Sequence, residues 1–136
     1  MPADLEYPQG LVRLDDVRAA SRRIARHVLR LPPLPAAWSG PDRPLLLKAE
    51  NLQPIGAFKL RGALNAVANL PKEALAKGIV THSSGNHGQA VAYAAKEYGV
   101  SATVVMPDVS AQVKIDAVRA LGAEVVLVPL NEREAR

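Results

Sequence analysis

Residues 78–128 decide the fold, and they read GIVTHSSGNHGQAVAYAAKEYGVSATVVMPDVSAQVKIDAVRALGAEVVLV. Short apolar runs alternate in this stretch with longer segments that carry helical patterning. We expect strands at 79–82, 102–106 and 124–128 and helices at 89–98 and 110–121. Strands and helices that alternate with short links indicate parallel strands joined by right-handed crossovers. The sequence therefore predicts an α/β fold, a parallel twisted sheet with flanking helices.

A run of polar and glycine residues, Ser83-Ser84-Gly85-Asn86-His87-Gly88, follows the first expected strand. In open α/β sheets ligands bind at the carboxyl ends of the strands, and the start of the following helix favours an anion. The glycines allow close approach of a ligand to the backbone, and the other side chains add hydrogen-bond donors. The alternative is a turn that only caps the helix. The sequence lacks a Gly-x-Gly-x-x-Gly pattern, so a dinucleotide site is not supported.

A lysine at an expected helix start is the second candidate for chemistry. The segment 56–63 reads GAFKLRGA, and a helix is expected from 58 to 69. The positive end of the helix dipole disfavours a cation there, which favours the free amine of Lys59 as a nucleophile. The alternative is a solvated helix lysine, with Phe58 as a core aromatic and Arg61 as a surface charge.

The N-terminal part is expected to be less regular. A loose arm at 1–13 precedes a basic helix at 15–29, which a proline cluster ends. We interpret the arginines around this helix as a solvated face; they are Arg18, Arg22, Arg26 and Arg30. A strand at 45–50, a turn at 51–57 and a brief helix at 73–77 complete this part of the chain.

Three polar or glycine positions mark the ends of helices. Ser110 is expected to be the N-cap of the helix at 110–121, and Gly122 the residue just after its end. Asn131 and Glu134 have capping-box spacing, which predicts the start of a further helix. The sequence ends two residues later, and a small parallel sheet would keep an open edge. Both features predict that the chain is the truncated N-terminal portion of a longer protein.

Composition excludes several function classes. The 136 residues include 17 Lys plus Arg and 13 Asp plus Glu, a formal net charge of +4. The sequence has no cysteine, which excludes disulfides, a thiolate nucleophile and Cys-ligated metals. It has neither a long apolar run nor a signal peptide, so a cytoplasmic protein without membrane partners is expected. Aromatic residues make up only 4%, which disfavours nucleic-acid binding, and we expect no metal site.

Two segments of the chain resemble those of a known enzyme family. The first is Lys48-x-Glu50-Asn51-Leu52-Gln53-Pro54 followed by the segment 56–63, and the second is the run 83–90. Together they resemble the lysine motif and the substrate-carboxylate loop of fold-type II enzymes that depend on pyridoxal 5'-phosphate (PLP). The resemblance extends from about residue 14 to the last residue. It is closest to the serine/threonine dehydratase and serine racemase branch.

The resemblance implies a role for each residue of the two segments. Lys59 would bind PLP covalently and then move the α-proton of the substrate, and Phe58 would pack beside the cofactor ring. Asn86 would hydrogen-bond the ring hydroxyl. The substrate carboxylate would be held by Ser83, Ser84, Gly85, Asn86 and His87. Ser84 would face Lys59 across the cofactor, where racemases use a serine as the second acid/base.

The resemblance also implies an activity and a domain division. The activity would be an ammonia-lyase (dehydratase) reaction on a serine- or threonine-type β-hydroxy amino acid, giving a 2-oxo acid and ammonia. Serine racemase activity and a non-catalytic α/β remnant remain as alternatives. Residues 1–47 would be the N-terminal edge of the large PLP domain, and 48–136 the small βαβαβ domain of a tryptophan synthase β-like fold. No two glycines are adjacent, so the phosphate-binding glycine run would lie beyond Arg136, and the isolated chain would be inactive. The complete protein is expected to be a homo-oligomer.

Overall fold

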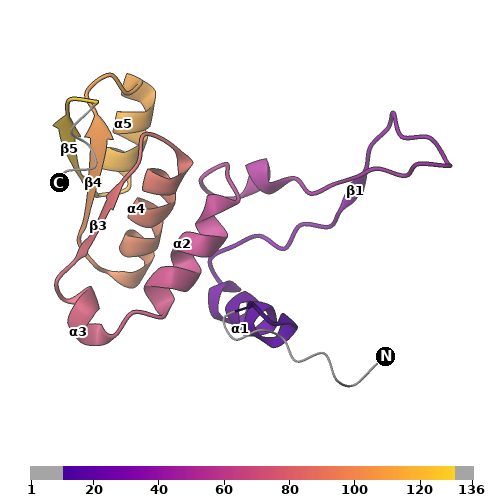
Figure 1. The fold of residues 1–136 in the computed structure, drawn as a ribbon, viewed down its shortest axis with the longest axis horizontal. Helices are drawn as coiled ribbons and strands as arrows, with labels where there is room; N and C mark the ends of the chain where they lie inside the picture. The colour runs from indigo at the N-terminus through magenta and orange to yellow at the C-terminus, as the bar shows by residue number, and fades with distance from the viewer. Residues whose placement is uncertain (1–10, 131–136) are drawn as a thin grey trace.

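The computed structural model describes residues 11–130, and its centre is a three-stranded parallel sheet. The strands are β3 (Ile79–His82), β4 (Ala102–Pro107) and β5 (Glu124–Val128), in the order β3-β4-β5. Ile79 lies opposite Ala102 in one ladder, and Thr103 lies opposite Glu124 in the other. Figure 1 shows all three strands pointing towards the same end of the molecule. The α/β fold predicted from the alternating pattern is confirmed.

Helices pack against this sheet and then against one another. The elements are α4 (Asn86–Tyr98), which contacts β3 and β4, and α5 (Gln112–Ala120), which contacts β5. A third helix, α2 (Lys59–Ala68), packs along α4, and the short α3 (Lys72–Leu75) leads into β3. In Figure 1, α2 and α4 begin at the end of the molecule where the strands finish. The fold thus brings the start of α2 and the β3–α4 turn to one end.

Two apolar clusters join these layers. The cluster between α2 and α4 consists of Ile24, Leu60, Ala63, Leu64, Val67, Ala90, Val91 and Ala94. The cluster between the sheet, α4 and α5 consists of Ala92, Ala95, Ala102, Val104, Met106, Ile115, Val118 and Ala123. Helix α4 contributes alanines to both clusters, so one of its faces is buried against α2 and the other against β4. These small side chains let the neighbouring elements pack close to α4. Both sides of the candidate site are therefore anchored on α4.

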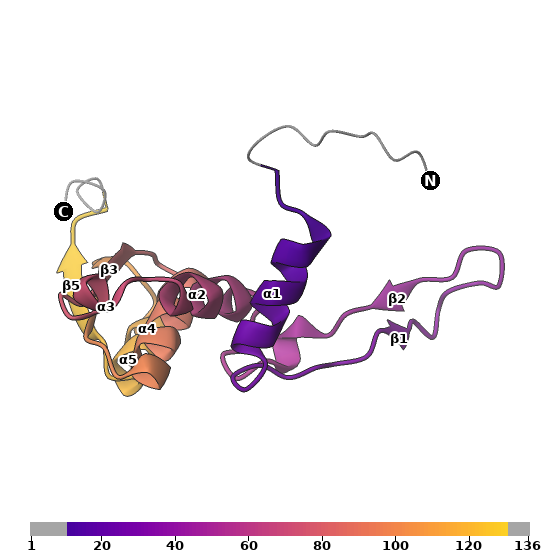
Figure 2. The ribbon, with the colours of Figure 1, turned by 90° about the horizontal axis from the view of Figure 1, so that it is seen from below.

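The N-terminal part forms a helix and a projecting arm. The helix α1 (Leu14–Ile24) is followed by an arm that runs away from the sheet and returns (Figure 1 and Figure 2). In the arm, β1 (Leu34–Pro35) pairs antiparallel with β2 (Leu46–Leu47), and η1 (Glu50–Leu52) follows. Apolar side chains are exposed along the arm; they include Leu34, Trp38, Leu45, Leu46 and Leu47. Within residues 11–130, this ladder makes no pairing with the parallel sheet.

Two of these N-terminal elements are shorter than the sequence predicted. The first helix ends at Ile24 instead of at 29, because the chain turns there: His27 N–H donates to the Ile24 carbonyl at 2.9 Å, and the His27 ring bonds Glu97 of α4 at 2.8 Å. The strand expected at 45–50 is reduced to β2. In the register of this ladder Lys48 and Ala49 would lie opposite Pro33 and Pro32, which have no N–H to extend it.

Helix starts in the sheet region also differ from the expectation. Helix α4 begins at Asn86, three residues early, because Gly85 is extended (φ −147°, ψ −148°) and its carbonyl accepts the N–H of Gln89 at 3.5 Å. Ser110 does not cap α5; Ala111 occupies that position, and the Ser110 hydroxyl is buried without a hydrogen-bond partner. Gly122 follows α5 with a φ of +87°, as predicted. The predictions for 1–10 and for the helix at Asn131 lie outside the described residues.

Candidate active site

Lys59 is the first residue of α2 and reaches the end of the molecule where the strands finish. Phe58 occupies the N-cap position, and its side chain makes no capping hydrogen bond. Leu60, the residue after Lys59, is fully buried in the α2–α4 core. The Lys59 amine lies 5.4 Å from the centroid of the Phe58 ring, which is itself 62% exposed. The expected helix start is confirmed. Phe58 is therefore a surface aromatic beside the amine, and the interpretation of it as a core residue is wrong.

The polar run after β3 forms a tight turn and then the first turn of α4. Ser83 continues the ladder by donating its N–H to the Val105 carbonyl at 3.0 Å, and its hydroxyl accepts the Gly85 N–H at 3.2 Å. Ser84 is exposed, as are Asn86 and His87. No side chain caps the start of α4, so the first amides of this helix are not satisfied by a capping side chain.

Gly88 serves packing and does not line an open approach to a ligand. A Cβ atom built at Gly88 would lie 3.0 Å from Val104 Cγ1 and 3.3 Å from the Ser83 carbonyl oxygen. A Cβ at Gly85 would meet nothing within 4 Å. The first turn of α4 therefore rests against β4 only because residue 88 is glycine. Of the two glycines predicted to admit a ligand, only Gly85 borders open space.

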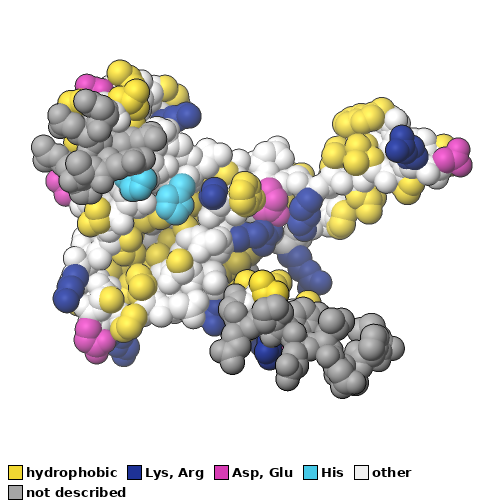
Figure 3. Space-filling view, in the orientation of Figure 1, with side chains coloured by type: hydrophobic (Ala, Val, Ile, Leu, Met, Phe, Trp, Pro, Cys, Tyr) yellow, Lys and Arg dark blue, Asp and Glu magenta, His cyan; other side chains and the backbone are white. Residues whose placement is uncertain are grey.

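A cavity of about 370 Å³ brings the two candidate segments together. Lys59 from α2 and His87 from α4 contribute its two ionisable side chains. The rest of its lining consists of Gly62, Ala63, Ala66, Val67, Leu70, Ile79, Val80, Thr81 and Val91. Among the described residues, Ser83, Ser84, Gly85 and Asn86 are not part of this lining. Figure 3 shows His side chains (cyan) beside Lys or Arg (dark blue) at this end of the molecule.

An ion pair holds the base of α2 against the segment that precedes it. Arg61 forms two parallel hydrogen bonds with the Glu50 carboxylate, Nε to Oε2 and Nη2 to Oε1, both at 2.8 Å. These bonds hold the pKa of the Glu50 carboxyl below its ordinary value of 4.5, and the positive charge of Lys48 acts in the same direction. The same Arg61 Nη2 donates to the Leu29 carbonyl at 3.2 Å.

Gln53 completes this arrangement from the buried side. Its side chain is 3% exposed, and its amide forms both possible bonds with the Leu29 backbone, each at 2.9 Å. The backbone carbonyl of Gln53 also accepts the Gly56 N–H at 2.7 Å, at the turn where Gly56 has a φ of +69°. We call Glu50, Gln53, Arg61 and the Leu29 backbone the base clamp. It fixes the loop that delivers the chain to Lys59.

The sequence does not predict the base clamp, although its side chains lie in and next to the lysine motif. The alternative that Arg61 is only a surface charge is wrong, and the sequence predicts no separate role for Glu50 and Gln53. The available signal was a glutamine and a glutamate at fixed distances before a helix arginine. Their partner Leu29 lies more than twenty positions earlier, and a local pattern does not reveal such a contact.

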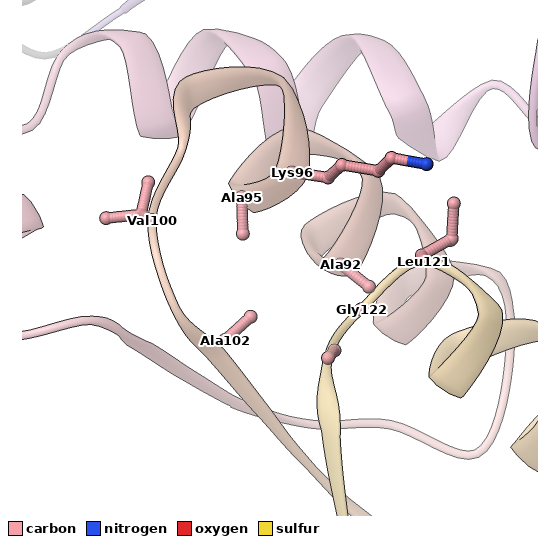
Figure 4. A pocket seen from close by; sticks show the side chains of 8 residues that line it. Ala92, Ala95, Lys96, Val100, Ala102, Leu121 and Gly122 are labelled. Carbon is pink, nitrogen blue, oxygen red and sulfur yellow. The ribbon is translucent and has the colours of Figure 1, made fainter.

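A second, smaller cavity lies away from the candidate site. It has a volume of about 170 Å³ and sits between the end of α4, the start of β4 and the link from α5 to β5. Figure 4 shows that small side chains such as Ala92, Ala95 and Ala102 surround it, and that the Lys96 amine extends past them. Within residues 11–130, no three His, Cys, Asp or Glu side chains are grouped to hold a metal ion, and no helix has the length and apolarity to cross a membrane.

Comparisons with known proteins place these features in an enzyme family. The chain is 43% identical to serine racemase from Dictyostelium discoideum over 120 residues, which is 87% of this chain and 37% of that protein. It is 53% identical to L-threonine ammonia-lyase from Geobacter sulfurreducens over 92 residues, 68% of this chain and 23% of that protein. The crystal structure of the Dictyostelium serine racemase superposes with a TM-score of 0.85 at 42% identity, covering 91% of this chain and 41% of that one.

The chain thus spans well under half the length of these relatives. A family profile described as pyridoxal-phosphate dependent enzyme matches residues 24–136, which include the base clamp, Lys59 and the turn after β3. The matched proteins share the fold-type II architecture expected from the two motifs. On this combination of sequence, fold and site, the chain belongs to the pyridoxal-phosphate-dependent enzymes of the serine/threonine dehydratase and serine racemase type.

Proposed function

We propose that this chain carries the lysine and the substrate-carboxylate turn of an ammonia-lyase acting on serine- or threonine-type β-hydroxy amino acids. The observation that carries the proposal is that Lys59 and His87, in the first turns of α2 and α4 at the end where the strands finish, line one cavity that extends along β3. Parallel α/β sheets bind ligands at this end of their strands. The 53% identity to an L-threonine ammonia-lyase supports the reaction type.

The residues present fit PLP. An aldehyde needs a lysine amine that is accessible and fixed at its base, and Lys59 is exposed while its helix is anchored by buried Leu60 and by Arg61. Phe58 offers an exposed ring beside that amine. When bound, PLP would supply the electron sink that lets an amino acid lose its α-proton.

The chain's own groups would bind the substrate and move its protons. The uncapped first turn of α4 and the Ser83–Gly85 turn would hold the substrate carboxylate, with Asn86 and His87 contributing side-chain donors. Asn86 would also bond the ring hydroxyl of the cofactor. Lys59 would take the α-proton at its amine. Such positioned acid–base groups contribute about 10²–10⁴-fold in rate.

Serine racemase activity is the second candidate function, and a specific residue favours it. Ser84 is exposed in the turn after β3, free of the hydrogen bond that holds Ser83. On the face opposite Lys59, its hydroxyl would return a proton to the substrate α-carbon. The 43% identity to a serine racemase supports this alternative. The third alternative is a non-catalytic remnant that binds only an anion. The anion would bind at the same turn, and Lys59 would have no role.

The first experiment tests whether Lys59 is the residue that PLP labels. The chain is incubated with PLP, reduced with borohydride and mapped by mass spectrometry. We expect the phosphopyridoxyl group on Lys59, its loss in Lys59→Ala, and no loss in Lys72→Ala, a control lysine on the surface helix α3. Label spread evenly over the lysines would contradict the role of Lys59 and favour the non-catalytic reading.

The second experiment separates the two activities. A chimera in which this chain replaces the matching part of the Dictyostelium serine racemase is assayed for 2-oxo acid and for D-serine. Ser84→Ala is expected to lower racemisation at least tenfold more than elimination, because only racemisation needs a proton on the second face. Equal loss of both activities would refute the role of Ser84.

The domain division stays part of this proposal. The exposed leucines and Trp38 of the arm support the view that residues 1–47 form the edge of a large PLP domain, because so much apolar surface on an extended arm normally meets a partner surface. Residues 48–136 would then form the small domain. The cytoplasmic location, the homo-oligomer and the inactivity of the isolated chain stay predictions.

A further inference from the structure

A further cavity, different from the two described above, lies on the other side of α2 from the candidate active site. Its volume is about 560 Å³, which is within the range of small-ligand sites. The lining residues come from α1, the segment after it, the strand-to-loop segment before η1, and α2; they are Ser21, Arg22, Ala25, Val28, Arg30, Lys48 and Arg61. It shares no lining residue with the cavity of Lys59 and His87.

The charge of this lining is one-sided. Four of its seven side chains are cations, and none is a carboxylate. Glu50, which lies outside the lining, already accepts two hydrogen bonds from Arg61. Figure 3 shows Lys and Arg side chains (dark blue) gathered where α1, α2 and the base of the arm meet. The hydrogen bonds from Arg61 chiefly lower the pKa of the Glu50 carboxyl, and the charge of Lys48 adds to this effect.

Two of the four cations are held in place by the protein. The Lys48 amine donates to the Leu31 carbonyl, and Arg61 is fixed by Glu50 and the Leu29 carbonyl. Side chains that are held before a ligand arrives lose less entropy when it binds. Lys48 and Arg61 thus form a fixed wall of the cavity.

The other two cations have open hydrogen-bonding capacity. Among residues 11–130, neither Arg22 nor Arg30 forms an ion pair. Each guanidinium presents up to five N–H donors in a planar fork that matches the oxygens of a phosphate. The sequence pattern suggested a solvated basic face, but the turn after Ile24 folds Arg30 back so that it shares one cavity with Arg22.

We propose that this cavity binds a small, multiply charged phosphate-bearing anion. Glu50 balances the charge of Arg61, and no carboxylate of the lining balances the other three cations. These three come from separate segments and match an anion with several oxygens on more than one side. Such an anion would join α1 to the base clamp, and through Arg61 to the helix that begins at Lys59. The proposal goes beyond the ammonia-lyase function and does not depend on it.

Binding of pyrophosphate to the full chain, at constant ionic strength, tests the proposal. NMR shifts of the amides of residues 20–31 report on this cavity separately from the turn at 83–87, where an anion is also expected. We expect saturable shifts in this segment. The double variant Arg22→Gln/Arg30→Gln should weaken binding at least tenfold, and Arg26→Gln at most twofold. Arg26 is exposed in the same segment, lies outside the lining and removes a like charge.

Four results would overturn the proposal. The first two are shifts that do not saturate and unchanged binding in the double variant. The third is an equal loss in Arg26→Gln, which would indicate general attraction to a basic surface, and the fourth concerns the comparison anion. Arg22 and Arg30 are exposed, so their removal should leave the thermal unfolding midpoint of the ligand-free chain within a few degrees. Citrate serves as the comparison anion, and binding as tight as that of pyrophosphate would refute the phosphate preference.

Discussion

The ion pair between Glu50 and Arg61 should make the stability of this chain depend on pH in a defined way. The perturbation is Glu50→Gln, which keeps the shape of the side chain and removes its charge. Exposed ion pairs contribute about 0.2–1 kcal/mol, whereas removing one partner of a fully buried pair costs about 3–5 kcal/mol. The Arg61 and Glu50 side chains are 33% and 19% exposed and meet through two bonds. We therefore expect a coupling of about 1–2 kcal/mol.

The sign of the pH dependence follows from the direction of the pKa shift. The folded chain holds the pKa of Glu50 below 4.5, so the carboxylate stabilises the fold at every pH above that value. This contribution is lost as the pH falls from 4.5 through the lower folded-state pKa. Arg61 stays charged throughout, because its pKa lies far above this range and the bonds that it donates to Glu50 raise it further. The stability difference between the parent chain and Glu50→Gln should therefore shrink on acidification.

The assay is urea unfolding of a double-mutant cycle, Glu50→Gln with Arg61→Gln, at neutral pH and in steps down to about pH 3. Asp15→Asn is the matched control, since Asp15 pairs with Arg18 at 3.0 Å while the two side chains are 88% and 60% exposed. The control should cost less than about 0.5 kcal/mol. A cycle coupling below about 0.3 kcal/mol, or one that does not change with pH, would refute the reasoning.

Three further substitutions test how closely the segments pack. Gly88→Ala should destabilise the chain by about 1–2 kcal/mol in urea unfolding, because its Cβ would lie 3.0 Å from Val104 Cγ1; a stabilised variant would contradict this packing. Gly62→Ala is the control in α2, where a Cβ meets nothing within 4 Å, and it should stabilise the chain by about 0.5–1 kcal/mol. Gln53→Met should lower the free energy of unfolding by about 1–3 kcal/mol, because it leaves the Leu29 N–H without its partner. Hydrogen exchange at the Leu29 amide should become faster in that variant, and unchanged exchange would count against the base clamp.

The sequence was most informative where structure is local. The strands and helices between Ile79 and Val128 follow from alternation, glycine and proline, and the start of α2 at Lys59 follows from the turn residues before it. Tertiary contacts decided the rest. The first helix stops at Ile24 because His27 bonds Glu97, seventy positions later. Ser110 does not cap α5, because Ala111 occupies the N-cap position and the Ser110 hydroxyl is buried without a hydrogen-bond partner.

The sequence predicts the two segments of the candidate site. It does not predict the contacts that hold these segments in place. The alternation of strands and helices explains why Lys59 and His87 reach the same end of the sheet. It does not reveal that Gly88 serves packing, since that depends on Val104 from the neighbouring strand. The alternation also does not predict that Arg22 and Arg30 line one cavity, because this arrangement depends on the turn after α1.

The lysine motif combines chemistry and support within one turn of helix. Lys59 and Phe58 point to solvent at the start of α2, and Arg61, two positions on, points back to Glu50 and Leu29. Arg61 is able to make three bonds in two directions because its guanidinium is a planar fork, and a lysine amine has no such geometry. Arg61→Lys keeps the charge, so a purely electrostatic role would survive it. We expect instead that it behaves like Arg61→Gln in unfolding and lowers PLP labelling of Lys59, whereas full rescue by lysine would reduce the base clamp to a simple charge pair.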